Sequence, residues 1–160
     1  MSSVLRRILA QKQREIRVLR EEGLPGGTGP ASEDLRDFEG TISAGGGISL
    51  ISEVKFASPS AGAIAALQNR DPVGIARMYE RAGAAAVSVL TDKTFFQGDR
   101  DHLRLVKRHT SVPVLRKDFI LDEIQVRESF LYGADAVLLI ARILSFSRLG
   151  KLLEECRALG

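Results

Sequence analysis

Two short apolar segments end in charged side chains whose types and spacing suit chemistry on an anionic ligand. The first, residues 48–54, carries Glu53 and Lys55 at its end, and the second, residues 112–120, carries Lys117. Because side chains alternate along a strand, Glu53 and Lys55 should point to the same side. A carboxylate and an ammonium are costly to bury there unless they are paired or act on a ligand. The pattern predicts a polar site in which a lysine can hold an anion or deliver a proton.

The rest of the sequence supplies the strands and helices that would position this site. Continuous apolar runs at residues 84–91 and 134–141 are typical of strands buried on both faces. Helices are predicted between and after the four runs because capping residues precede apolar positions at helical spacing. The expected caps are Asp71, Asp99 or Asp101, Asp122, and Ser145 or Ser147. This order of elements predicts a parallel sheet with right-handed crossovers.

Two further helices are predicted before the first strand. The longer one covers roughly residues 3–21, with an apolar stripe on one face. That stripe consists of Leu5, Ile8, Leu9, Ile16 and Leu19. A short helix is expected over residues 32–38, between two glycine-rich joints.

Charges at several strand ends favour a (β/α)₈ barrel over a doubly wound sheet. The loop Ser58-Pro-Ser-Ala-Gly62 has neither the glycine spacing of a dinucleotide turn nor that of a P-loop. Barrels carry their sites at the carboxyl ends of the strands. A barrel takes about 250 residues, whereas this sequence has 160. We therefore expect an N-terminal (βα)₄ part with two open sheet edges.

Four motifs, each at the end of a predicted strand, give the sequence a family resemblance. They are Glu53-Val-Lys55-x-x-Ser58-Pro-Ser60-x-Gly62, Ser88-Val-Leu-Thr91 with Phe95-Phe96-x-Gly98, Leu115-Arg-Lys-Asp-Phe119, and Gly133-Ala-Asp-Ala-Val-Leu-Leu-Ile140. In this order they resemble the indole-3-glycerol-phosphate synthase family over the whole chain. The resemblance implies a TIM barrel of the ribulose-phosphate-binding type. Residues 1–160 would be one incomplete domain, with an N-terminal helical extension (1–47) followed by the first four βα units (48–160).

The resemblance also implies an activity and the residues that perform it. The family converts 1-(2-carboxyphenylamino)-1-deoxyribulose 5-phosphate into indole-3-glycerol phosphate, CO₂ and water, in tryptophan biosynthesis, without a metal or organic cofactor. Lys117 would be the general acid, Lys55 would contact the anionic substrate and assist dehydration, and Glu53 would be its carboxylate neighbour. Other residues would surround the substrate. These are Ser58, Phe96, Phe119, Leu138 and Ile140.

Simpler interpretations of the same residues stay open. Glu53 and Lys55 could form only a structural ion pair, and Lys117 could be a solvated lysine. The apolar residues named above could be barrel core. Another phosphate-handling barrel, such as phosphoribosylanthranilate isomerase, is disfavoured by the Lys-Asp-Phe and Glu-x-Lys-x-x-Ser-Pro-Ser motifs.

The first helix carries a basic cluster that we interpret as its solvated face. The cluster consists of Arg6, Arg7, Lys12, Arg14, Arg17 and Arg20. Nucleic-acid binding is not expected, because stacking aromatic residues do not accompany these charges.

The remaining acid and base groups and the phosphate site of the family are expected on strands five to eight, beyond this sequence. We therefore expect these 160 residues to be an N-terminal fragment that is inactive alone. The alternative is a non-catalytic half-barrel that assembles with itself or with a partner chain through its open sheet edges. Its inner face would then expose apolar side chains. The expected ones are Val87, Val89, Val114, Leu138 and Ile140.

Composition predicts a cytoplasmic protein with one sizeable core. Hydrophobic residues make up 44% of the chain, and the net charge is +3, which suits an anionic phosphorylated small molecule. A single cysteine, Cys156, excludes an internal disulfide. Apolar runs are too short and too often interrupted by polar residues for a membrane span or a signal peptide.

Overall fold

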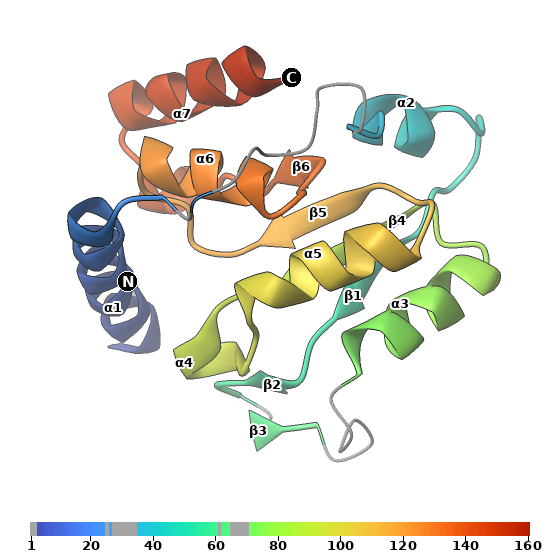
Figure 1. The fold of residues 1–160 in the computed structure, drawn as a ribbon, viewed down its shortest axis with the longest axis horizontal. Coiled ribbons are helices and arrows are strands. Elements are labelled where there is room, and N and C mark those ends of the chain that lie inside the picture. Colours follow the sequence, from blue (N-terminus) through green and yellow to red (C-terminus); the bar gives the residue numbers. More distant parts are fainter. Residues whose placement is uncertain (1–2, 25, 27–34, 61, 65–70) are drawn as a thin grey trace.

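Four parallel strands form the main sheet of the computed structural model, which describes residues 3–24, 26, 35–60, 62–64 and 71–160 (Figure 1). Their order in the sheet is β1 (Ile51–Val54), β4 (Ala86–Leu90), β5 (Val114–Lys117) and β6 (Ala136–Val137). Within this sheet, each strand pairs in parallel with the strand of the next βα unit. A separate antiparallel ribbon pairs β2 (Ala57–Ser58) with β3 (Gly62–Ala63).

Helices alternate with these strands and precede them. They are α1 (Ser3–Glu22), α2 (Phe38–Ser43), α3 (Pro72–Arg81), α4 (Lys93–Phe96), α5 (Arg100–His109), α6 (Glu123–Leu131) and α7 (Phe146–Leu159), with a 3₁₀ turn at Ala141–Ile143. The fold is therefore the N-terminal (βα)₄ part of a TIM barrel with an extra N-terminal helix, as the sequence predicts.

Short polar side chains begin most of these helices, because each satisfies a backbone N–H that has no partner within the helix. Asp71, Asp99, Asp122 and Ser145 cap α3, α5, α6 and α7, which decides between the two candidates that the sequence offered for α5 and for α7. The prediction of a helix over 32–38 was wrong for residues 35–37, which are not helical; residues 32–34 lie outside the described part. Instead, α2 begins at Phe38, and the Asp37 carboxylate accepts the N–H of Gly40.

The main hydrophobic core lies between the sheet and helices α3 and α5. Val87, Val89 and Val114 are fully buried there against Ile75 of α3 and Leu103 of α5. The expectation that these three valines face the open inner side was wrong. Side chains two residues apart in a strand point to the same face, and in this sheet the face that Val87, Val89 and Val114 share is the one covered by the helices.

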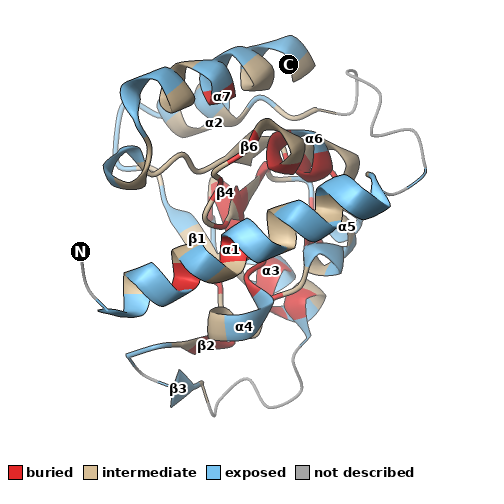
Figure 2. Cartoon of the chain, turned by 90° about the vertical axis from the view of Figure 1, so that its left-hand side faces the viewer, coloured by how far each residue is buried: buried red, intermediate tan, exposed pale blue. Residues whose placement is uncertain are grey.

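A second apolar cluster joins α6 to α7, which lie side by side beyond β6 (Figure 1). Helix α1 crosses the end of the sheet at which the strands terminate, and α2 lies at the opposite end (Figure 1). Most of α1 is exposed, with buried positions only at Ile8 and Lys12 (Figure 2). Among the helices that the structure describes, none is long and apolar enough to cross a membrane.

Candidate active site

Glu53, Lys55 and Lys117 meet at the carboxyl ends of the strands. The Lys55 amine lies 2.7 Å from Oε1 of Glu53, and the Lys117 amine donates to Oε2 of the same carboxylate. Lys117 belongs to β5, which is separated from β1 by β4. The Glu53 and Lys117 side chains meet across β4, where Ser88 is in register with Glu53 and Leu90 with Lys117. The predicted convergence on one mouth is therefore present.

Electrostatics favour the ionised form of Glu53. Partial burial by itself raises the pKa of this carboxyl, but hydrogen bonds from Lys117 and then Lys55 outweigh burial and hold the pKa below its ordinary value. The backbone is also held, because the Tyr79 hydroxyl donates to the Glu53 carbonyl at 3.3 Å. Both amines stay accessible, with the Lys117 side chain 40% exposed and that of Lys55 35% exposed. A charged, partly open pair of amines can bind an anion and can donate a proton.

The predicted apolar residues of the site follow the ends of β4, β5 and β6 along the chain. The rings of Phe96, at the end of α4, and Phe119, after β5, have centroids 6.3 Å apart and planes inclined at 38°. The N–H of Leu138 donates to the Arg116 carbonyl, which extends the pairing of β6 with β5 by one residue. Leu138 is thus in register with Lys117. Ile140 lies beyond the end of β6, directly before the 3₁₀ turn at Ala141–Ile143.

The expected serine lies on the β2–β3 ribbon. Ser58 is half-buried, and its hydroxyl lies 3.4 Å from that of Ser60. The structure therefore brings Glu53, Lys55 and Lys117 into direct contact and places the rings of Phe96 and Phe119 beside each other. Their roles toward a substrate stay predictions.

Lys12 is the residue that the sequence interpretation missed. It was assigned to the solvated face of the first helix, but it is buried and pairs with carboxylates of Glu15, Asp92 and Asp118. The available signal was its position: Lys12 is four residues from both Ile8 and Ile16, in the middle of the apolar stripe.

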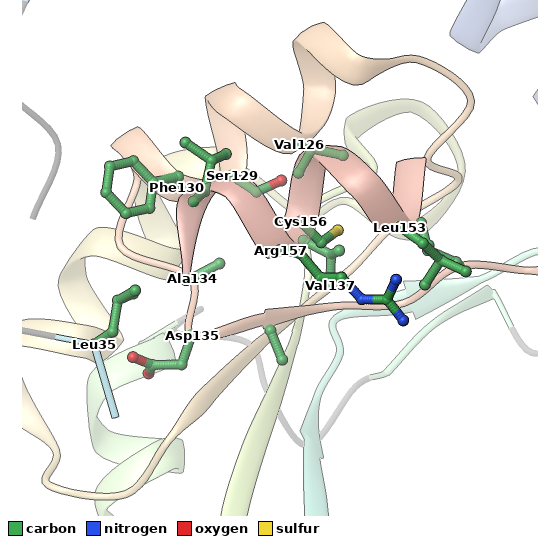
Figure 3. Close-up of a pocket in the computed structure, with 14 residues that line it drawn as sticks. Leu35, Val126, Ser129, Phe130, Ala134, Asp135, Val137, Leu153, Cys156 and Arg157 are labelled. Atoms are coloured by element: carbon green, nitrogen blue, oxygen red, sulfur yellow. The ribbon is translucent and has the colours of Figure 1, made fainter. Parts of the chain in front are cut away.

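An apolar cavity of about 430 Å³ lies elsewhere, between α6, α7 and β6 (Figure 3). Its lining includes Val126, Phe130, Val137, Leu153 and Cys156, and none of the predicted site residues. Burial, with a smaller effect of Glu155, raises the pKa of the Cys156 thiol, which disfavours the reactive thiolate. We therefore place the candidate site at the charged strand ends. Over the residues described, no group of three or more His, Cys, Asp or Glu side chains could hold a metal ion.

Comparison with known proteins gives one consistent result. The family model described as indole-3-glycerol phosphate synthase matches residues 5–160. The indole-3-glycerol phosphate synthase of Desulfotalea psychrophila is 47% identical over 154 residues, covering 93% of this chain and 58% of that protein. The protein of the same name from Pelodictyon phaeoclathratiforme is 48% identical, covering 99% of this chain and 62% of the relative. That of Campylobacter jejuni subsp. doylei is 53% identical over 113 residues, covering 71% of this chain and 43% of the relative. The chain thus spans about three fifths of the length of the first two relatives.

Proposed function

The chain belongs to the indole-3-glycerol phosphate synthase family, and from this we propose that its charged strand ends contribute to the active site of a carboxy-lyase. The proposed substrate is 1-(2-carboxyphenylamino)-1-deoxyribulose 5-phosphate, an anionic phosphorylated small molecule. The products are indole-3-glycerol phosphate, CO₂ and water, and the step belongs to tryptophan biosynthesis, which is consistent with a cytoplasmic location.

The observation that carries this proposal is the pairing of two amines with one carboxylate at the mouth of the sheet. Ring closure joins the ring carbon that bears the carboxylate to the ketone carbon, and the ketone oxygen needs a proton as its charge develops. Lys117 is proposed to donate that proton, because an ammonium held at a strand end can act as general acid. Loss of CO₂ then restores the aromatic ring, and the new hydroxyl group leaves as water.

The neighbouring groups suit the other parts of such a substrate. Lys55 is proposed to bind the substrate carboxylate and to assist dehydration, while Glu53 keeps both amines oriented until the ligand replaces its contacts. The rings of Phe96 and Phe119, together with Leu138 and Ile140, are proposed to pack against the aromatic ring of the substrate. Ser58 is proposed to contact the substrate from the ribbon.

Lysine replacement tests the assignment in the protein that contains these residues. Lys117→Met should lower kcat by about 10²–10⁴-fold with a smaller change in KM, because a general acid acts in the transition state. Lys55→Met should also raise KM, since it removes a charge-assisted contact. Lys151→Met, at an exposed position on α7, is the matched control and should change neither constant. An unchanged kcat in the Lys117 variant would rule out its role as the acid.

A second candidate function is assembly through the sheet edges, and the open sheet favours it. In the described part of the chain, β1 and β6 are the outer strands of the four-stranded sheet. Leu50, directly before β1, is 55% exposed, and Ile51, the first residue of β1, is 41% exposed. We expect residues 1–160 prepared alone to associate as concentration rises and to show no turnover. Size-exclusion chromatography with an activity assay checks this, and an active monomer would contradict it.

A further inference from the structure

Lys12 of α1 is a buried lysine held by three carboxylates. Its amine lies 2.8 Å from Glu15, 2.9 Å from Asp92 and 2.8 Å from Asp118, and its side chain is 3% exposed. Burial by itself lowers the pKa of Lys12, but attraction to Asp118 and then Asp92 outweighs burial, so that pKa is raised. The amine is therefore charged at any ordinary pH, and its desolvation is compensated only while these carboxylates stay in place.

The Asp118 carboxylate connects the Lys12 amine to β5 and to the backbone that follows this strand. Oδ1 accepts the Lys12 amine and, at 2.8 Å, the N–H of Phe119, while Oδ2 accepts the Thr91 hydroxyl at 2.6 Å and Arg116 at 3.1 Å. Four donors around one carboxylate leave it little freedom. Because one of those donors is the next backbone N–H, the carboxylate also fixes the direction of the chain between Lys117 and Phe119.

Asp92 anchors the other half of the aromatic pair. Its Oδ1 caps α4 by accepting the N–H of Phe95 at 2.6 Å, and its Oδ2 faces the Lys12 amine. Helix α4 ends at Phe96, whose ring lies beside that of Phe119. One amine on α1 therefore joins two aspartates, each of which orders a segment that carries a residue of the site.

We propose that Lys12 is a positioning residue: by holding Asp92 and Asp118 together it sets the Lys117 amine and the Phe96–Phe119 pair for reaction. The inference rests on the proposed function for its catalytic consequence. Its structural consequence, the ordering of the backbone at Phe119, can be measured without turnover.

The test compares Lys12→Met with Arg20→Met in the protein that contains this chain. Arg20 also joins α1 to the segment after β5, through a 2.7 Å contact with Asp122, but it contacts neither aspartate of the Lys12 cluster. Arg20→Met therefore controls for the general loss of a contact from α1. Each variant is measured for kcat, for KM and for hydrogen exchange at the Phe119 amide relative to that of Leu152, which reports global opening.

Lys12→Met should lower kcat by up to about 10²-fold with a smaller change in KM, as misplacement of reacting groups by about 1 Å can do. Relative exchange at Phe119 should rise by more than about tenfold, because the accepting carboxylate loses a charged partner. Arg20→Met should change neither. A folded Lys12→Met protein with wild-type kcat and wild-type exchange at Phe119 would overturn the proposal.

Two further outcomes are decided by the same design. If Lys12→Met does not fold, Asp118→Asn, which keeps the size of the side chain, should reproduce both effects, and its failure to do so also overturns the proposal. If the unmutated protein shows no turnover, the proposed function fails, and exchange at Phe119 alone decides whether Lys12 orders this segment.

Discussion

Acid should destabilise this chain through protonation of the buried Asp118 carboxylate. Burial by itself raises the pKa of Asp118, but the charges of Arg116 and Lys12 outweigh burial and lower it from 3.8 to about 2. The folded chain then holds this carboxylate ionised where the unfolded chain has begun to bind a proton. The resulting stability is fully present above pH 3.8 and is lost as pH falls through about 2. A lowering of this size corresponds to about 2 kcal/mol.

Asp118→Asn isolates this contribution from those of other carboxylates, such as Glu80 and Glu155, whose pKa values are also lowered. Urea unfolding of both proteins, followed by circular dichroism at pH 7, 5, 4, 3 and 2, gives the free energy of unfolding of each. At pH 7 the variant should be less stable by about 2 kcal/mol or more, since it leaves Lys12 and Arg116 with one carboxylate fewer. The difference should shrink by about 2 kcal/mol between pH 5 and pH 2. Parallel curves over that interval would refute the electrostatic account of Asp118.

Two sites of close packing should be sensitive to substitution. Gly98→Ala should lower the free energy of unfolding by about 1–3 kcal/mol, because a Cβ there would lie 2.2 Å from the Leu90 carbonyl oxygen and 2.9 Å from Thr91 Cα. Thermal unfolding measures the loss, and an unchanged midpoint would contradict that close contact. Leu103→Ala should lower the free energy of unfolding by about 2–5 kcal/mol, because Leu103 is fully buried between α5 and the sheet. Leu105→Ala on the same helix, at 41% exposure, should lower it by less than about 1 kcal/mol. Equal losses in the two variants would contradict the core assignment.

The sequence predicted helices and strands correctly where they depend on interactions between residues close together in the chain. Asp71, Asp122 and Ser145 each precede an apolar helical repeat, and each caps the helix expected there. The apolar run at 84–91 became β4, with every residue from Ala86 to Leu90 buried. The last strand is shorter than expected, since β6 covers only Ala136 and Val137 of the run 134–141.

The errors came from interactions between residues distant in the sequence. Lys12 looked solvated because basic residues surround it along α1, but its partners Asp92 and Asp118 lie 80 and 106 positions further along the chain. The prediction that three valines face the inner side of the sheet was wrong for a related reason. An apolar run that is buried on both faces does not reveal which parity faces the helices, and Val87 and Val89 proved to be on the helix side.

Neighbouring residues of β5 point to opposite faces of the sheet, so that one stabilises the fold and the other reaches the candidate site. Arg116 points to the helix layer, where it contacts Glu128 at 2.9 Å and Asp118 at 3.1 Å, and the next residue, Lys117, points to the opposite face and reaches Glu53. A slip of one residue would exchange them, because the side-chain period of a strand is two. Lys117 would then lie between the sheet and the helices, and the Glu128 carboxylate would lose its contact with Arg116. Leaving a buried carboxylate without its cation is costly. The buried ion pairs of Arg116 therefore oppose the slip that would remove Lys117 from the mouth, so the same network that stabilises β5 also determines which of its two cations faces a ligand.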